Sequence, residues 1–131
     1  MKKDLNISSA IENLRLVEKA IDELSLELDL SDELYGNVLV ATMEATNNAI
    51  IHGNQSDPGK QVKIAIEFKQ KELNIHVEDQ GRGFDYNNIP DPTAPENVEK
   101  INGRGIFLME RLSDELLYME DGRIVQLKFR L

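Results

Sequence analysis

Residues 44–53 of this 131-residue chain read EATNNAIIHG and bring a carboxylate, an amide and a glycine into one short segment. Apolar residues recur at helical spacing before and through this stretch, so we expect one helix that Ser31 caps and that ends at Gly53 as its C′ glycine. Glu44 and Asn48 are four residues apart and therefore lie one turn apart on the same helix face.

A carboxylate and an amide oxygen stacked in this way are suited to a hard divalent cation and to a polarised hydroxyl nearby. The alternative is an ordinary polar stripe on a solvent-facing helix. We expect His52 to be structural in either case.

The flanking segments predict the rest of the fold. On the N-terminal side, Leu5–Ile7 alternate briefly as a possible edge strand, and Ser9 with Glu12 has the spacing of a capping box for a helix over 9–28. On the C-terminal side, alternating residues predict strands at 61–69 and 72–79, paired as a hairpin.

Beyond the hairpin, three prolines interrupt a loop over 85–102, and a short helix is expected at 106–112. A second hairpin is predicted around Asp121-Gly122. This order of elements indicates an α+β fold in which three helices cover one face of a mostly antiparallel, mixed sheet.

Two glycine clusters follow in the chain. Asp79, Gly81 and Gly83 come directly after a strand, where glycines let the backbone approach a ligand closely and where Asp79 could accept a hydrogen bond from the exocyclic amine of adenine. Gly103 and Gly105 flank Arg104 ahead of the short helix, where free N–H groups and a positive charge suit phosphate. A tight turn and a hinge are the alternative interpretations.

Composition limits the classes of function. The chain has 40% hydrophobic and 30% charged residues, so we expect a single globular domain over 1–131. It has no cysteine, and no apolar run or leader that would indicate a membrane span or secretion, so we expect a cytoplasmic protein. Its net charge of -9 argues against nucleic acid as the main partner.

The order of the motifs resembles one family, the histidine-kinase-like ATPases, and within it the bacterial anti-sigma factor serine kinases. Residues 44–53 resemble the N box of that family, 79–83 its first glycine box, and 103–105 its second. The resemblance covers essentially the whole chain.

The resemblance implies a role for each matching residue. Glu44 would be the general base, Asn48 would coordinate the Mg²⁺ that bridges the ATP phosphates, and Asp79 would read adenine. Gly81 and Gly83 would shape the adenine pocket. Residues 85–102 would form a lid over ATP, with Gly103, Arg104 and Gly105 at its phosphate-contacting hinge.

The resemblance also implies an activity and partners. The expected reaction is phosphorylation of a serine on an anti-anti-sigma protein with a STAS fold, and the expected second partner is a sigma factor, with a homodimer possible. Two other hypotheses remain at this point: a switch in which nucleotide controls partner binding without phosphoryl transfer, and a protein-docking scaffold that has lost nucleotide binding.

Overall fold

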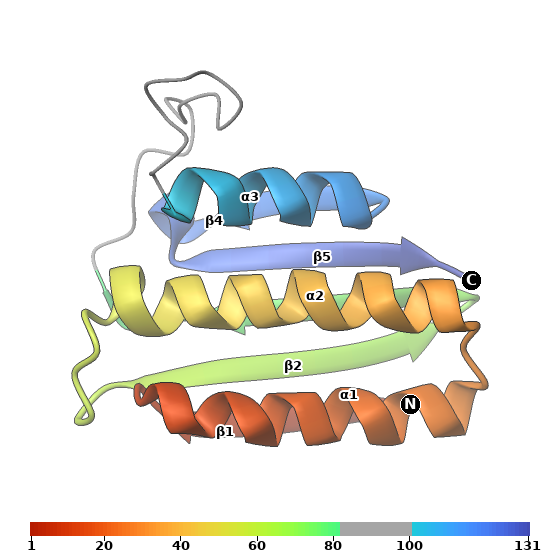
Figure 1. Ribbon diagram of the computed structural model, residues 1–131, viewed down its shortest axis with the longest axis horizontal. Coiled ribbons are helices and arrows are strands. Elements are labelled where there is room, and N and C mark those ends of the chain that lie inside the picture. Colours follow the sequence, from red (N-terminus) through yellow and green to blue (C-terminus); the bar gives the residue numbers. More distant parts are fainter. Residues whose placement is uncertain (82–100) are drawn as a thin grey trace.

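An antiparallel sheet of five strands carries three helices on one of its faces (Figure 1). The computed structural model describes residues 1–81 and 101–131, and for 101–106 it describes the backbone alone. The strands are β1 (Lys2–Ser8), β2 (Gln61–Lys69), β3 (Glu72–Glu78), β4 (Glu115–Met119) and β5 (Ile124–Arg130), in the order β1-β2-β3-β5-β4. The expected α+β class is confirmed, although the pairings among the described strands are all antiparallel rather than mixed.

The helices are α1 (Leu14–Leu28), α2 (Asp32–Asn48) and α3 (Ile101–Leu112). The predicted cap of α2 is confirmed, because the Leu34 N–H donates to Ser31 Oγ at 3.1 Å. The capping box predicted at Ser9 is wrong. A 3-10 turn, η1 (Ile11–Asn13), precedes α1, and the Ser9 hydroxyl instead donates to the Lys60 carbonyl at 2.7 Å.

The core lies between the sheet and the helices. Alternate residues of β2, β3 and β5 face the helices, and each buried aliphatic side chain contributes roughly 1.5–3 kcal/mol relative to its exposed state. The fully buried members include Val17, Ile21, Leu24, Val38, Ile50, Ile64, Ile66, Leu73, Ile75 and Leu127. The helical and strand periodicities in the sequence therefore meet in one continuous core.

Both predicted hairpins are present. The β2–β3 turn places Gln70 and Lys71 at φ values of 55° and 64°, the left-handed geometry of a type I′ turn, although neither residue is a glycine or asparagine. The β4–β5 connection, η4 (Glu120–Gly122), has positive φ at all three of its residues. In both hairpins this backbone twist matches the twist of the flanking strands.

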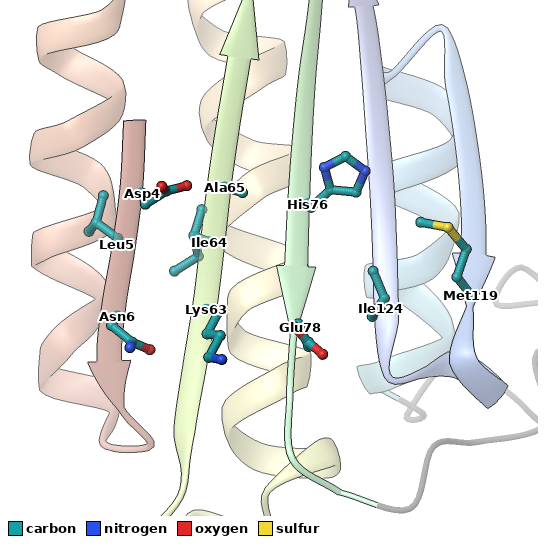
Figure 2. Close-up of a pocket in the computed structure, with 10 residues that line it drawn as sticks. All are labelled: Asp4, Leu5, Asn6, Lys63, Ile64, Ala65, His76, Glu78, Met119 and Ile124. Atoms are coloured by element: carbon teal, nitrogen blue, oxygen red, sulfur yellow. The ribbon is translucent and has the colours of Figure 1, made fainter. Parts of the chain in front are cut away.

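The sheet face opposite the helices carries a pocket of about 400 Å³, which Figure 2 shows with His76 on β3, the middle strand of the sheet. Its lining residues are Asp4, Leu5, Asn6, Lys63, Ile64, Ala65, His76, Glu78, Met119 and Ile124. None of the residues predicted to form the functional site lines this pocket.

Charged side chains form a network at one end of this open face. The Lys128 ammonium lies 3.1 Å from a Glu115 carboxylate oxygen and 3.7 Å from one of Glu72, and Arg130 lies 3.4 Å from Glu115. The hydrogen bond and positive charge of Lys128 lower the pKa of Glu115. These pairs are partly exposed, so each stabilises the sheet only modestly.

The two chain ends lie together at one end of the sheet (Figure 1). The Met1 ammonium donates to the Phe68 carbonyl at 3.2 Å, and the Leu131 N–H donates to the Lys71 carbonyl at 2.8 Å, so both ends flank the β2–β3 turn. Glu78, the last residue of β3, is at the opposite end. Within the described ranges, no helix is long and apolar enough to cross a membrane.

Candidate functional site

The last turns of the α2 segment change from α-helix to π-helix. After Asn48 the chain continues as η2 (Ala49–Gly53), and the Asn54 N–H donates to the Ala49 carbonyl five residues earlier at 2.8 Å. Single π turns within helices are frequent at functional sites. Here the π-helical segment places Gly53 against the segment that follows β3.

Gly53 directly contacts Asp79. A Cβ added at Gly53 would lie 2.3 Å from both Cγ and Oδ2 of Asp79. The prediction of Gly53 as a left-handed C′ glycine is wrong, since Gly122 is the one glycine with positive φ in the described part of the chain. Glycine is required at position 53 because the Asp79 carboxylate occupies the space that a side chain would take.

Gly81 closes the other side of the same carboxylate. A Cβ at Gly81 would lie 1.9 Å from the Gly53 carbonyl oxygen, and the Gly81 N–H donates to Asp79 Oδ1 at 2.7 Å. Two glycine backbones therefore hold the Asp79 side chain between them. The alternative of an ordinary glycine turn does not account for this close packing.

Asp79 is a buried carboxyl group with 7% of its surface exposed. Burial raises its pKa, while the Gly81 N–H and the charge of Arg123 act in the opposite direction. Its backbone N–H donates to the Arg123 carbonyl at 2.9 Å. A buried acceptor fixed at both main chain and side chain is suited to selecting a ligand donor such as an exocyclic amine.

Asn48 and Glu44 lie on α2, and both are half-buried. Asn48 is the last residue of α2 and precedes Gly53, the last residue of the π-helical segment, by five positions. Its side-chain oxygen is buried and has no hydrogen-bond partner among the described residues. An acceptor in that state fits a Mg²⁺ ion that takes one protein oxygen and fills its other positions with water and phosphate.

The remaining predicted site residues are described only in part. Gly83 and most of the predicted lid at 85–102 fall outside the described residues. The helix predicted after Gly105 in fact begins at Ile101, so Gly103, Arg104 and Gly105 belong to the first turns of α3 rather than to a hinge before it.

Asn54 is a residue that sequence reasoning missed. It is fully buried, and its side chain bonds three separate segments near Asp79. No local pattern distinguishes it from an ordinary turn asparagine, because its partners lie 7 to 45 residues away in the sequence.

Comparison with known proteins agrees with this geometry. The family model of the histidine kinase-like ATPase domain matches residues 7–129. The chain is 31% identical to the anti-sigma F factor of Shouchella clausii (strain KSM-K16) over 126 residues, which cover 94% of this chain and 86% of that protein. It is 24% identical to the serine-protein kinase RsbW of Bacillus cereus (strain AH820), with coverage of 92% and 78%.

A solved structure shares the fold. The crystal structure of the RsbU and RsbW domains of Rv1364c from Mycobacterium tuberculosis superposes with a TM-score of 0.73 at 18% identity. The match covers 100% of this chain and 32% of that one. The chain belongs to the histidine kinase-like ATPase family, in its anti-sigma kinase branch.

Proposed function

We propose that this protein is a Mg²⁺- and ATP-dependent serine kinase of the anti-sigma type. The observation that carries the proposal is the buried Asp79 carboxylate held between Gly53 and Gly81, next to the helix that bears Glu44 and Asn48. The names of the two bacterial relatives, an anti-sigma F factor and a serine-protein kinase, support the same activity.

Asp79 would select the nucleotide. Its carboxylate would accept a hydrogen bond from the exocyclic amine of adenine, whereas the carbonyl oxygen of guanine would face it as a second acceptor and be rejected. Gly81 and Gly83 would leave room for the base, and Gly103, Arg104 and Gly105 would contact the phosphates through the first turns of α3. The protein would therefore bind ATP more tightly than GTP, and the difference in binding free energy would be the cost of leaving a buried acceptor unpaired.

Glu44 and Asn48 would serve the transfer step. Mg²⁺, held by the Asn48 oxygen, would neutralise charge on the phosphates. Glu44 would accept the proton of the substrate serine hydroxyl while the serine Oγ forms a bond to the γ-phosphorus and the bond to ADP breaks. Because phosphoryl transfer needs mainly positioning and electrostatic stabilisation, this small set of groups suffices.

The serine would belong to an anti-anti-sigma protein with a STAS fold, and the second partner would be a sigma factor in the cytoplasm, bound while its antagonist is phosphorylated. A homodimer is compatible with this scheme.

The test separates binding from transfer. We expect calorimetry to show Mg²⁺-dependent binding of ATP and exclusion of GTP, and radiolabel transfer from ATP to a STAS-domain protein. Glu44→Gln keeps the shape of the side chain and should bind ATP within about twofold of the unmodified chain, while transfer falls by 10² or more because a positioned base contributes about that factor.

The outcomes distinguish the hypotheses. ATP binding without transfer, unchanged by Glu44→Gln, would instead support a nucleotide-controlled switch. Absence of nucleotide binding at millimolar concentration would refute the kinase and leave the docking scaffold.

A further inference from the structure

Asn54 connects the segment after the π-helix to both sides of the candidate nucleotide site. Its Nδ2 donates to Ser9 Oγ at 2.8 Å and to the Gln61 carbonyl at 3.0 Å, and its Oδ1 accepts the Gln80 N–H at 2.7 Å. The side chain is 0% exposed. It is therefore a buried amide with both of its N–H groups and its oxygen engaged.

The orientation of this amide is fixed by its neighbours. The Gln61 carbonyl can only accept, and the Gln80 N–H can only donate, so a flipped amide would face both partners with the wrong group. The network extends further, since Gln80 Oε1 accepts the Gln61 N–H at 2.7 Å and Ser9 also donates to the Lys60 carbonyl at 2.7 Å. Asn54 thus joins the ends of β1 and β3 to the start of β2.

Gln80 is the residue between Asp79 and Gly81. The N–H groups of all three are occupied: that of Asp79 by the Arg123 carbonyl, that of Gln80 by Asn54, and that of Gly81 by the Asp79 carboxylate. The Asn54 contact fixes the peptide plane that joins Asp79 to Gln80. That plane determines how the Asp79 side chain leaves the backbone.

We propose that Asn54 is a positioning residue that sets the adenine-reading geometry of Asp79 without touching the nucleotide. This inference rests on the proposed function. Without the amide oxygen, the peptide between Asp79 and Gln80 loses the hydrogen bond that fixes its plane, and the direction of the Asp79 carboxylate between the two glycines is less firmly set. The effect is therefore on adenine discrimination as well as on stability.

The test compares ATP with purine riboside triphosphate, which lacks the exocyclic amine. A hydrogen bond to a charged, buried acceptor corresponds to a preference for ATP on the order of 10- to 100-fold in the unmodified chain. We expect Asn54→Ala to reduce this ratio of dissociation constants to within about threefold of unity. Asn54→Ala and its control variant are made in a Gly36→Ala background, because an alanine at this open helical position stabilises α2 and offsets part of the stability that is lost.

Ser9→Ala is the matched control. It removes a hydroxyl from the same network, but it leaves the Asn54–Gln80 contact intact. We expect it to lower the unfolding temperature while the preference for ATP stays unchanged. A merely structural Asn54 would instead show the same preference for ATP in Asn54→Ala as in Ser9→Ala, which would overturn the proposal.

Amide hydrogen exchange gives a readout that needs no nucleotide. In the unmodified, nucleotide-free chain, the backbone amide of Gln80 should exchange slowly, at a rate typical of the core. Asn54→Ala should accelerate the exchange of this amide, whereas Ser9→Ala should not. Rapid exchange of the Gln80 amide in the unmodified chain would refute the proposed restraint of this peptide by the Asn54 side chain. Slow exchange combined with equal affinity for ATP and the purine analogue would refute the adenine-reading role, and with it the positioning of that role by Asn54.

Discussion

Substitution of Gly53 by alanine tests the close packing on which the candidate site depends. The added Cβ would lie 2.3 Å from Asp79 Cγ and Oδ2, whereas ordinary contacts begin near 3.4 Å. The carboxylate or the π-helix must therefore move by about 1 Å. Asp79 has little room for this movement, because Gly81 packs on its other side and donates to it at 2.7 Å.

Two responses are available to the protein, and both impair the site. If the backbone yields, overpacking costs about 1–3 kcal/mol, which in a domain of this size lowers the unfolding temperature by about 3–15 °C. If Asp79 instead rotates away, stability changes less, but the carboxylate no longer points at the ligand. In either case we expect ATP affinity to fall by about tenfold or more.

The assay pairs thermal unfolding with ATP calorimetry, and Gly36→Ala is the control. Gly36 lies within α2, and nothing lies within 4 Å of a Cβ built there. That substitution should raise stability by about 0.5–1 kcal/mol and leave ATP binding unchanged. The reasoning is refuted if Gly53→Ala unfolds at the temperature of the unmodified protein and binds ATP with the same affinity.

Two further predictions concern charge. Burial raises the pKa of Asp79, so its contribution to stability falls as pH rises through that pKa. Asp79→Asn should therefore raise the unfolding temperature of the nucleotide-free protein at pH 7, and this gain should disappear in acid. The same variant should bind ATP about 10- to 100-fold more weakly in calorimetry. A variant that is less stable than the unmodified chain at pH 7 would contradict the stability prediction. Lys128 lowers the pKa of Glu115, so that contribution is present at neutral pH and is lost as pH falls through the lowered pKa. In urea unfolding, Glu115→Gln should be slightly less stable than the unmodified chain at pH 7 and equal to it in acid well below the lowered pKa or in 1 M salt. A difference that persists under both conditions would exclude an electrostatic origin.

The regular elements could be predicted because their signals are local. Strict alternation places the β2–β3 hairpin at the predicted residues, and Ser31 caps α2 because its hydroxyl reaches the Leu34 N–H within the same turn. Such patterns depend only on residues that are neighbours in the sequence.

The errors arise where distant segments meet. Ser9 has the spacing of a capping residue, yet its hydroxyl bonds Lys60 and Asn54, which lie 51 and 45 residues away. The sequence pattern predicts Gly53 as a helix-ending glycine, although the need for glycine at this position comes from Asp79, which follows β3 and lies 26 residues later. Asn54 was missed for the same reason. Motif order predicts which residues form the candidate site, but it does not predict the contacts that orient them.

The position of the chain ends has a practical consequence. Met1 and Leu131 flank the β2–β3 turn, whereas Asp79 follows the far end of β3, a strand about 20 Å long. A fusion partner or surface anchor attached at either chain end would therefore be joined at the end of the sheet that is opposite to Asp79. Tethered assays and tandem fusions, including arrangements like the joined domains of the mycobacterial chain, are therefore compatible with free access of a small molecule to this carboxylate.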